Sequence, residues 1–128
     1  MNEEVLKTLN EAVECLTDAK TMYENNRNKA TVSRAYYAMY HTAKAALVYA
    51  NIETYTHQGV SVQFSKYFIK TGIFDKSLIK SYNKMLDARQ KSDYEIGFSA
   101  SQDDAKHAVE EAANFYSIVE NYIISQNK

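Results

Sequence analysis

The sequence contains no proline and no tryptophan, and only three of its 128 residues are glycine. Proline and glycine are the residues that most strongly interrupt helices, so their scarcity favours long, unbroken helices. Cys15 is the single cysteine, which excludes an intrachain disulfide and a cysteine-rich metal cluster and fits a reducing compartment. We expect Cys15 to be a buried, inert thiol beside the apolar stripe of the first helix.

Long hydrophobic runs are also missing. No apolar stretch approaches the roughly 18 residues that a membrane-spanning helix requires. The N-terminal segment is acidic and amphipathic, whereas a secretory signal begins with basic residues followed by an apolar stretch. We therefore expect a cytoplasmic protein without a membrane segment.

The net charge of −1 is close to balance and argues against a protein that coats nucleic acid non-specifically. The charges are nevertheless unevenly placed. Residues 1–25 carry six acidic and two basic groups, residues 60–92 carry seven basic and two acidic groups, and residues 93–125 carry seven acidic groups and one basic group. Either neighbouring helices complement one another electrostatically, or the basic middle segment offers a surface to a phosphate-bearing ligand.

Apolar residues recur at helical spacing in five blocks. The first block ends near the polar run 25–28, the second covers roughly 29–50, and a short third covers about 60–70. A fourth runs from a possible cap at Asp75 to Gly97, and a fifth starts at the capping residue Ser101. Short loops between long amphipathic helices indicate antiparallel neighbours. We predict an all-α protein, an up-and-down four-helix bundle with an additional short helix, as a single domain over residues 1–128.

The second predicted helix is apolar on two opposite faces. One face has the spacing of a core stripe and includes Val32, Tyr36 and Met39. The opposite face combines small apolar residues with three polar ones, Arg34, Tyr37 and His41. A helix that is apolar nearly all round needs cover on both sides. The second face therefore requires either another layer of helices or a partner subunit.

Two arginines interrupt apolar stripes. Arg34 shares its face with Tyr37 and His41, and Arg89 shares its face with Asp93, one turn further along the fourth helix. An inward guanidinium keeps its charge and needs a carboxylate or a phosphate as its partner. Arg89 thus either forms an ion pair with Asp93, or contributes with Asp93 and the adjacent Tyr94 to an anion site. Arg34, Tyr37 and His41 are the other candidate ligand-binding residues.

The chain has three histidines, His41, His57 and His107. His57 falls in the loop predicted before the third helix, where we expect it to shape that loop through a hydrogen bond. No two histidines have ligand spacing with carboxylates, and no glycine-rich phosphate loop is present, so we predict neither a metal site nor a cofactor.

Four segments, taken in order, resemble the HEPN domain (higher eukaryote and prokaryote nucleotide-binding), in particular its small stand-alone prokaryotic members. They are Ser-Arg-Ala-Tyr-Tyr-Ala-Met-Tyr-His at 33–41, Thr-His-Gln-Gly-Val at 56–60, Tyr-Phe-Ile-Lys-Thr-Gly at 67–72 and Arg-Gln-Lys-Ser-Asp-Tyr at 89–94. The resemblance extends over about residues 5–124.

The resemblance implies a helical homodimer, often encoded beside a minimal nucleotidyltransferase as a toxin–antitoxin-like pair. Many HEPN proteins are metal-independent ribonucleases that use an Arg-x(4–6)-His motif in a late helix, at a cleft between two subunits. After Arg89, this chain has Tyr94, Glu95 and Ile96 where that histidine would stand. Arg34 and His41 match the spacing, but they lie on the second helix.

The resulting prediction is a HEPN-like component that binds a nucleotide or an RNA phosphate without the standard catalytic pair. Two alternatives stay open. One is a ribonuclease toxin whose catalytic residues are Arg89 with a displaced histidine, or Arg34 with His41. The other is a protein substrate for nucleotide transfer at Tyr94 by a nucleotidyltransferase partner.

Overall fold

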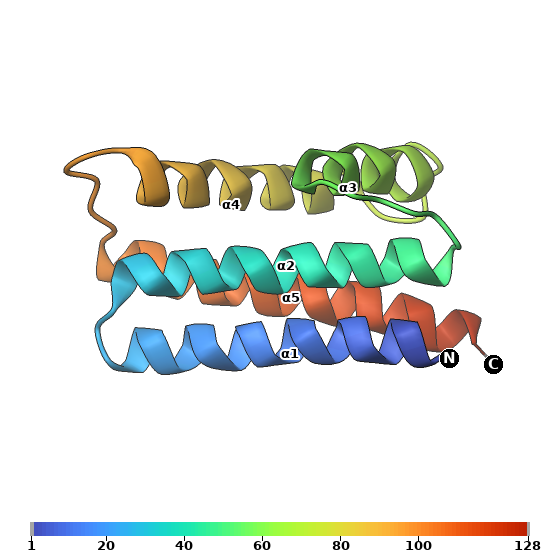
Figure 1. Ribbon diagram of the computed structural model, residues 1–128, viewed down its shortest axis with the longest axis horizontal. Helices are drawn as coiled ribbons and strands as arrows, with labels where there is room; N and C mark the ends of the chain where they lie inside the picture. The colour runs from blue at the N-terminus through green and yellow to red at the C-terminus, as the bar shows by residue number, and fades with distance from the viewer. Residues whose placement is uncertain (1, 128) are drawn as a thin grey trace.

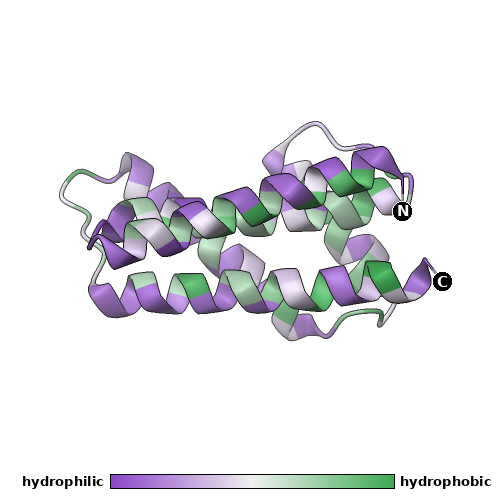
Figure 2. Ribbon diagram, turned by 90° about the horizontal axis from the view of Figure 1, so that it is seen from below, coloured by the Kyte–Doolittle hydropathy of each residue, from purple (hydrophilic) through white to green (hydrophobic). Residues whose placement is uncertain are grey.

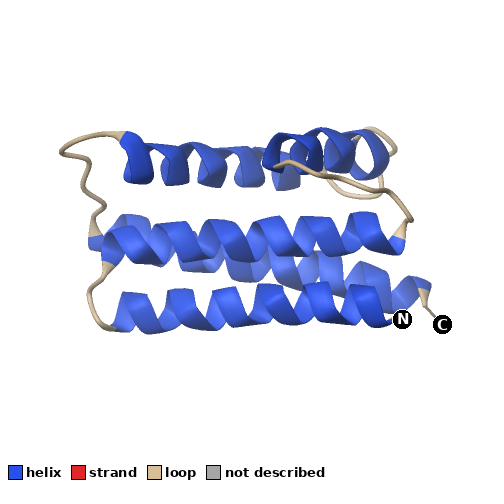
Figure 3. Ribbon diagram, viewed as in Figure 1, coloured by secondary structure: helices blue, strands red, loops and turns tan. Residues whose placement is uncertain are grey.

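The computed structural model describes residues 2–127, and their regular structure is helical throughout (Figure 3). The helices are α1 (Glu3–Glu24), α2 (Asn28–Tyr49), α3 (His57–Phe64), α4 (Lys76–Tyr94) and α5 (Gln102–Gln126), and a π-helical turn, η1 (Ser65–Ile69), continues α3. The predicted all-α bundle with one additional short helix is confirmed.

Side-chain caps fix where four of the helices begin. Asn2, Thr56, Asp75 and Ser101 each accept a hydrogen bond from a backbone N–H in the first turn of the helix that follows. At the start of α5, Ser101 is the cap that the sequence predicted, and it forms a reciprocal capping box with Asp104. Such caps pair backbone donors that the first turn of a helix leaves free.

The long helices α1, α2, α4 and α5 run up and down, and both chain ends lie at the same end of the bundle (Figure 1). The central element is α2, which contacts α1, α3, α4 and α5. Residues from both of its apolar faces, including Tyr36, Met39, Ala38 and Ala45, are buried. A second layer of helices from the same chain therefore covers the second face of α2, and this face gives no evidence for a partner subunit.

Two element boundaries differ from the sequence prediction. Thr56 caps α3, so His57 is the first residue of a helix and does not lie in a loop. A Cβ at position 59 would lie 2.9 Å from Thr56 Oγ1, which explains the glycine next to this cap. At the other end of the molecule, α4 stops at Tyr94, before the predicted end at Gly97, and Ile96 is fully exposed.

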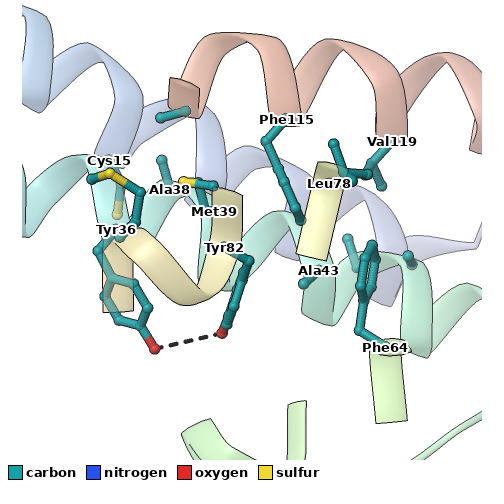
Figure 4. Packing of buried hydrophobic residues seen from close by; sticks show 14 of the residues in the cluster. Cys15, Tyr36, Ala38, Met39, Ala43, Phe64, Leu78, Tyr82, Phe115 and Val119 are labelled. Carbon is teal, nitrogen blue, oxygen red and sulfur yellow. Dashed lines mark hydrogen bonds between the residues drawn. The ribbon is translucent and has the colours of Figure 1, made fainter. Parts of the chain in front are cut away.

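The core lies between α2 and the helices around it. Green and purple residues alternate along the long helices in Figure 2, as expected for amphipathic helices that bury one face. The largest buried side chains include Tyr36, Tyr82, Phe64 and Phe115, which Figure 4 shows converging from four helices. Cys15 is buried, and its burial raises the pKa of the thiol, which fits the inert role predicted for it.

Candidate functional site

Arg89 lies on the face of α4 that packs toward α2, and its side chain is only 18% exposed. Its Nη2 donates a hydrogen bond of 2.8 Å to the hydroxyl of Tyr37 on α2. Its Nε lies 2.9 Å from Asp93 Oδ2, one turn along α4. The guanidinium also lies over the rings of Tyr37 and Tyr36, 5.3 and 5.8 Å from their centres. The ion pair between Arg89 and Asp93 that the sequence suggested is therefore present.

These contacts leave part of the Arg89 guanidinium available. The Nε is buried against Asp93 and is not open to a ligand, whereas Nη1 donates no hydrogen bond within residues 2–127. A guanidinium carries several N–H donors in one plane, which match the oxygens of a carboxylate or phosphate in pairs. Arg89 is thus held in place by Tyr37 and Asp93 and keeps donors for an anionic ligand.

His57 joins this cluster from the start of α3. Its Nδ1 lies 2.7 Å from the Tyr36 hydroxyl. Its ring stacks on Tyr40, with centres 4.0 Å apart and planes 14° apart, and meets the edge of Tyr37 at 5.8 Å. Because Tyr36 occupies Nδ1, Nε2 is the ring nitrogen that can meet a ligand.

Burial, and next the positive charge of Arg89, lower the pKa of His57 below the usual histidine value. The ring is therefore neutral near pH 7. A neutral imidazole can accept a proton, whereas an imidazolium can only donate one. The sequence did not predict that His57 lies beside Arg89. The one signal for it in the sequence is that Tyr36 and Tyr40, which both contact His57, lie one helical turn apart.

The Tyr36 hydroxyl connects His57 to the core. It lies 3.5 Å from the Tyr82 hydroxyl, and Figure 4 shows the two phenols pointing toward one another below the buried cluster. Burial raises the pKa of both tyrosines, so both hydroxyls stay protonated. A series of polar contacts therefore runs from α4 through Tyr36 to His57.

Arg34 and His41 lie elsewhere on α2. Arg34 is half exposed and faces Asp18 of α1, with Nε 3.9 Å from the carboxylate. His41 packs against the edge of Tyr40, and its burial lowers the pKa of its ring. Among the described residues no hydrogen bond joins Arg34 to His41. Of the three candidates on this predicted face, only Tyr37 contacts Arg89.

The remaining candidates lie at the end of α4. Asp93 is partly exposed beside Arg89, whereas Tyr94 is 75% exposed and has no described contact with the cluster. The basic residues of α4 outside the site are exposed, at Lys76, Lys80, Lys84 and Lys91. The site therefore consists of Arg89, Asp93 and Tyr37, with His57, Tyr36 and Tyr40 added by the fold.

Metal-ligating side chains do not gather at this site or elsewhere in the described chain. Within residues 2–127, no three His, Cys, Asp or Glu side chains lie together in a way that could hold a metal ion. No helix in the same range has the length and apolar character needed to span a membrane.

Comparisons with protein families and with solved structures lead to the same family. Residues 5–122 match the family model of the HEPN domain. The chain is 34% identical to a UPF0332 protein of Thermotoga maritima over 112 residues, which are 88% of this chain and 85% of the relative. It is 30% identical to a Methanocaldococcus jannaschii protein named "Putative toxin" over 124 residues, 97% and 84% of the two chains.

A solved structure shows the same fold. The crystal structure of an archaeal HEPN homologue superposes with a TM-score of 0.76 at 14% sequence identity, covering 96% of this chain and 99% of that one. At this identity the likeness concerns the fold alone.

Proposed function

This chain belongs to the HEPN domain family, and we propose that it is a component of a toxin–antitoxin-like pair that binds a nucleotide or an RNA phosphate at Arg89. The observation that carries the proposal is the mostly buried guanidinium of Arg89, which Tyr37 and Asp93 hold in place and whose Nη1 donates no hydrogen bond within the described chain. The relatives named as toxins support the toxin-like part of the proposal.

Phosphate is the ligand that best suits this geometry. An arginine positioned by a tyrosine hydroxyl and a carboxylate presents its remaining N–H groups at a fixed angle, which favours paired contacts with two oxygens. The partly exposed rings of Tyr37 and Tyr40 can stack with a base, as aromatic side chains do in many RNA-binding sites.

Binding of uridine monophosphate and of a short RNA to the purified protein tests the proposal. We expect Arg89→Ala to remove binding and Arg89→Lys to restore only part of it, because lysine cannot make paired contacts. Lys91→Ala is the matched control, since Lys91 is exposed on the same helix and pairs with Asp87 at 3.2 Å. Equal binding by Arg89→Ala and the unchanged protein would refute the proposal.

The position of His57 favours one second candidate function, a metal-independent ribonuclease with a displaced histidine. In that reaction, Nε2 of His57 takes the proton of the 2′-hydroxyl, and the 2′-oxygen attacks the phosphorus. The bond to the 5′-oxygen breaks, this oxygen takes up a proton, and a 2′,3′-cyclic phosphate remains. Arg89 stabilises the charge that develops on the phosphate oxygens.

Incubation with total RNA separates catalysis from binding. Cleavage products that end in 2′,3′-cyclic phosphate and disappear in His57→Ala, but persist in His107→Ala, would establish the ribonuclease and refute the non-catalytic proposal. Cleavage that depends on Arg34 and His41 would place the active site where α2 faces α1. Intact RNA in the presence of tight, Arg89-dependent binding supports the non-catalytic component.

Tyr94 remains the proposed acceptor for nucleotide transfer, because its exposed side chain at the end of α4 is accessible to a nucleotidyltransferase partner. Mass spectrometry after incubation with ATP and a minimal nucleotidyltransferase tests it. An adduct on Tyr94 that is absent in Tyr94→Phe supports the transfer, and an unmodified Tyr94 peptide refutes it.

We further propose that the protein forms a homodimer, as the family resemblance implies, with the Arg89 sites of the two chains at the interface. Light scattering at micromolar concentration measures its mass. A monomer under conditions where RNA binds would refute a shared site, because the cluster around Arg89 would then act within one chain.

A further inference from the structure

A hollow lies next to the Arg89 cluster, where α2 begins and α4 ends. It has a volume of about 560 Å³ and is lined by polar residues of both helices, including Arg27, Lys29, Ser33, Ser92 and Asp93. Asp93 belongs to both places, because it lines the hollow and its carboxylate pairs with Arg89. The hollow therefore continues the Arg89 site toward the end of the bundle.

The beginning of α2 supplies positive charge to this hollow. Arg27 precedes the helix and makes no side-chain cap, so the first N–H groups of α2 receive no side-chain acceptor. These groups carry the positive end of the helix dipole. Arg27 and Lys29 are exposed at the same place, and neither forms an ion pair within residues 2–127.

Two residues of the lining, Asn28 and Ser92, each carry a buried polar atom without a hydrogen-bond partner among the described residues, an observation independent of the helix end. Ser92 is only 1% exposed, and its hydroxyl has no hydrogen-bond partner within the described chain. Asn28 donates through Nδ2 to the carbonyl of Ala100 at 3.3 Å, but its buried Oδ1 also lacks a partner among the same residues. Buried polar groups are normally paired. A ligand that offers an acceptor to Ser92 and a donor to Asn28 would satisfy both.

A ribonucleotide unit has this combination, because its phosphate accepts hydrogen bonds and its 2′-hydroxyl can donate one. Asp93 is the acidic side chain in the lining, and Arg89 already compensates its charge. We propose that this hollow binds a second phosphate of the strand whose first phosphate binds Arg89. The ligand is then an RNA strand and not a mononucleotide. This inference rests on the proposed function of the Arg89 site.

Binding of a labelled uridine hexanucleotide and of uridine monophosphate, measured at several salt concentrations, tests the inference. The unchanged protein binds the hexanucleotide at least tenfold more tightly. Arg27→Ala/Lys29→Ala weakens hexanucleotide binding tenfold or more and reduces the slope of log K against log salt by about 0.7 for each phosphate that is no longer neutralised. The same variant leaves monophosphate binding unchanged. Lys7→Ala/Lys20→Ala removes equal charge from exposed positions of α1 and changes neither ligand's affinity.

Ser92→Ala separates ligand binding from structural support. Its hydroxyl has no partner in the described chain, so we expect the unfolding temperature to stay constant or rise while hexanucleotide binding weakens severalfold. If the hexanucleotide binds no more tightly than the monophosphate, or Arg27→Ala/Lys29→Ala leaves its affinity and salt slope unchanged, the inference is wrong and the Arg89 site still stands. If neither ligand binds and Arg89→Ala changes nothing, both proposals fail.

Discussion

Arg34 and Arg89 have the same side chain, and each lies near an aspartate, yet their surroundings differ. The Nε of Arg34 lies 3.9 Å from Asp18 Oδ2, and both side chains are nearly half exposed. Arg89 is mostly buried, donates a hydrogen bond to the Tyr37 hydroxyl, and places its Nε 2.9 Å from Asp93 Oδ2. An exposed ion pair gains little because water competes for both charges, whereas a desolvated guanidinium depends on its neighbours. Burial and partner geometry, and not residue type, distinguish a candidate site from a surface contact.

The aromatic surroundings of the two arginines differ in the same way. The Arg89 guanidinium lies over two tyrosine rings, and Tyr36 links this region to His57. Arg34 has neither a described ring contact nor a described hydrogen bond to a tyrosine. A ligand that reaches Arg89 therefore meets donors already held in position, and this lowers the entropy that binding must overcome.

Replacing Arg89 by alanine should have the largest effect on stability. The change leaves the Asp93 carboxylate and the Tyr37 hydroxyl without their partner and removes the contacts with two rings, so we expect a loss of about 2–3 kcal/mol in the free energy of unfolding. Urea denaturation monitored by circular dichroism measures it. A loss below about 0.5 kcal/mol would show that Arg89 behaves like a surface arginine.

Tyr36→Phe tests the polar connection behind Arg89 with a smaller expected effect. The variant keeps the ring but removes the hydroxyl that contacts His57 and Tyr82, which leaves the buried Tyr82 hydroxyl without this partner. We expect a loss of about 1–2 kcal/mol in the free energy of unfolding. Tyr40→Phe is the matched control, because Tyr40 contacts His57 through its ring and not through its hydroxyl. Equal losses in both variants would contradict the role given to the Tyr36 hydroxyl.

The fold could be predicted from the sequence because its determinants are local. Apolar spacing defines the helices, and Asp75 and Ser101 mark helix starts through short-range hydrogen bonds. The end of α4 was harder to predict from the sequence. The apolar Ile96 continues the helical spacing, although the helix already stops at Tyr94. Local spacing does not show where a buried face ends.

The site could be predicted only in part. Arg89 and Asp93 lie on one helix, four residues apart, so their pairing follows from helical geometry. The contact of Arg89 with Tyr37 spans 52 positions, and that of His57 with Tyr36 spans 21. These contacts depend on how α3 and α4 pack on α2, which the spacing of residues within a single helix does not determine.

The pH dependence of stability gives a third test, of smaller size. Burial lowers the pKa of His57 and of His41 in the folded chain, and Arg89 contributes at His57. Below about pH 6.5 the unfolded chain therefore binds more protons than the folded one, and stability falls as the pH drops. We expect a loss of less than about 2 kcal/mol between about pH 7 and about pH 5, measured by urea denaturation at each pH.

Proton NMR of the imidazole rings checks this directly. Both rings should titrate below about pH 6.5. Arg89→Ala should raise the titration midpoint of His57 more than that of His41, because the charge of Arg89 lowers the pKa of His57 alone of the two. A His57 midpoint above about 6.5 would contradict the lowering of its pKa by burial and by the charge of Arg89.

The smallest expected effect completes the comparison. Arg34→Ala should change the free energy of unfolding by less than about 0.5 kcal/mol, because the exposed pair with Asp18 at 3.9 Å is hydrated and weak. A double-mutant cycle of Arg34→Ala and Asp18→Ala should give a coupling energy in the same range, whereas a cycle of Arg89→Ala and Asp93→Ala should give more than about 1 kcal/mol. If the two coupling energies are equal, burial does not distinguish the two arginines. The choice of Arg89 over Arg34 as the ligand-binding residue would then lose its physical basis.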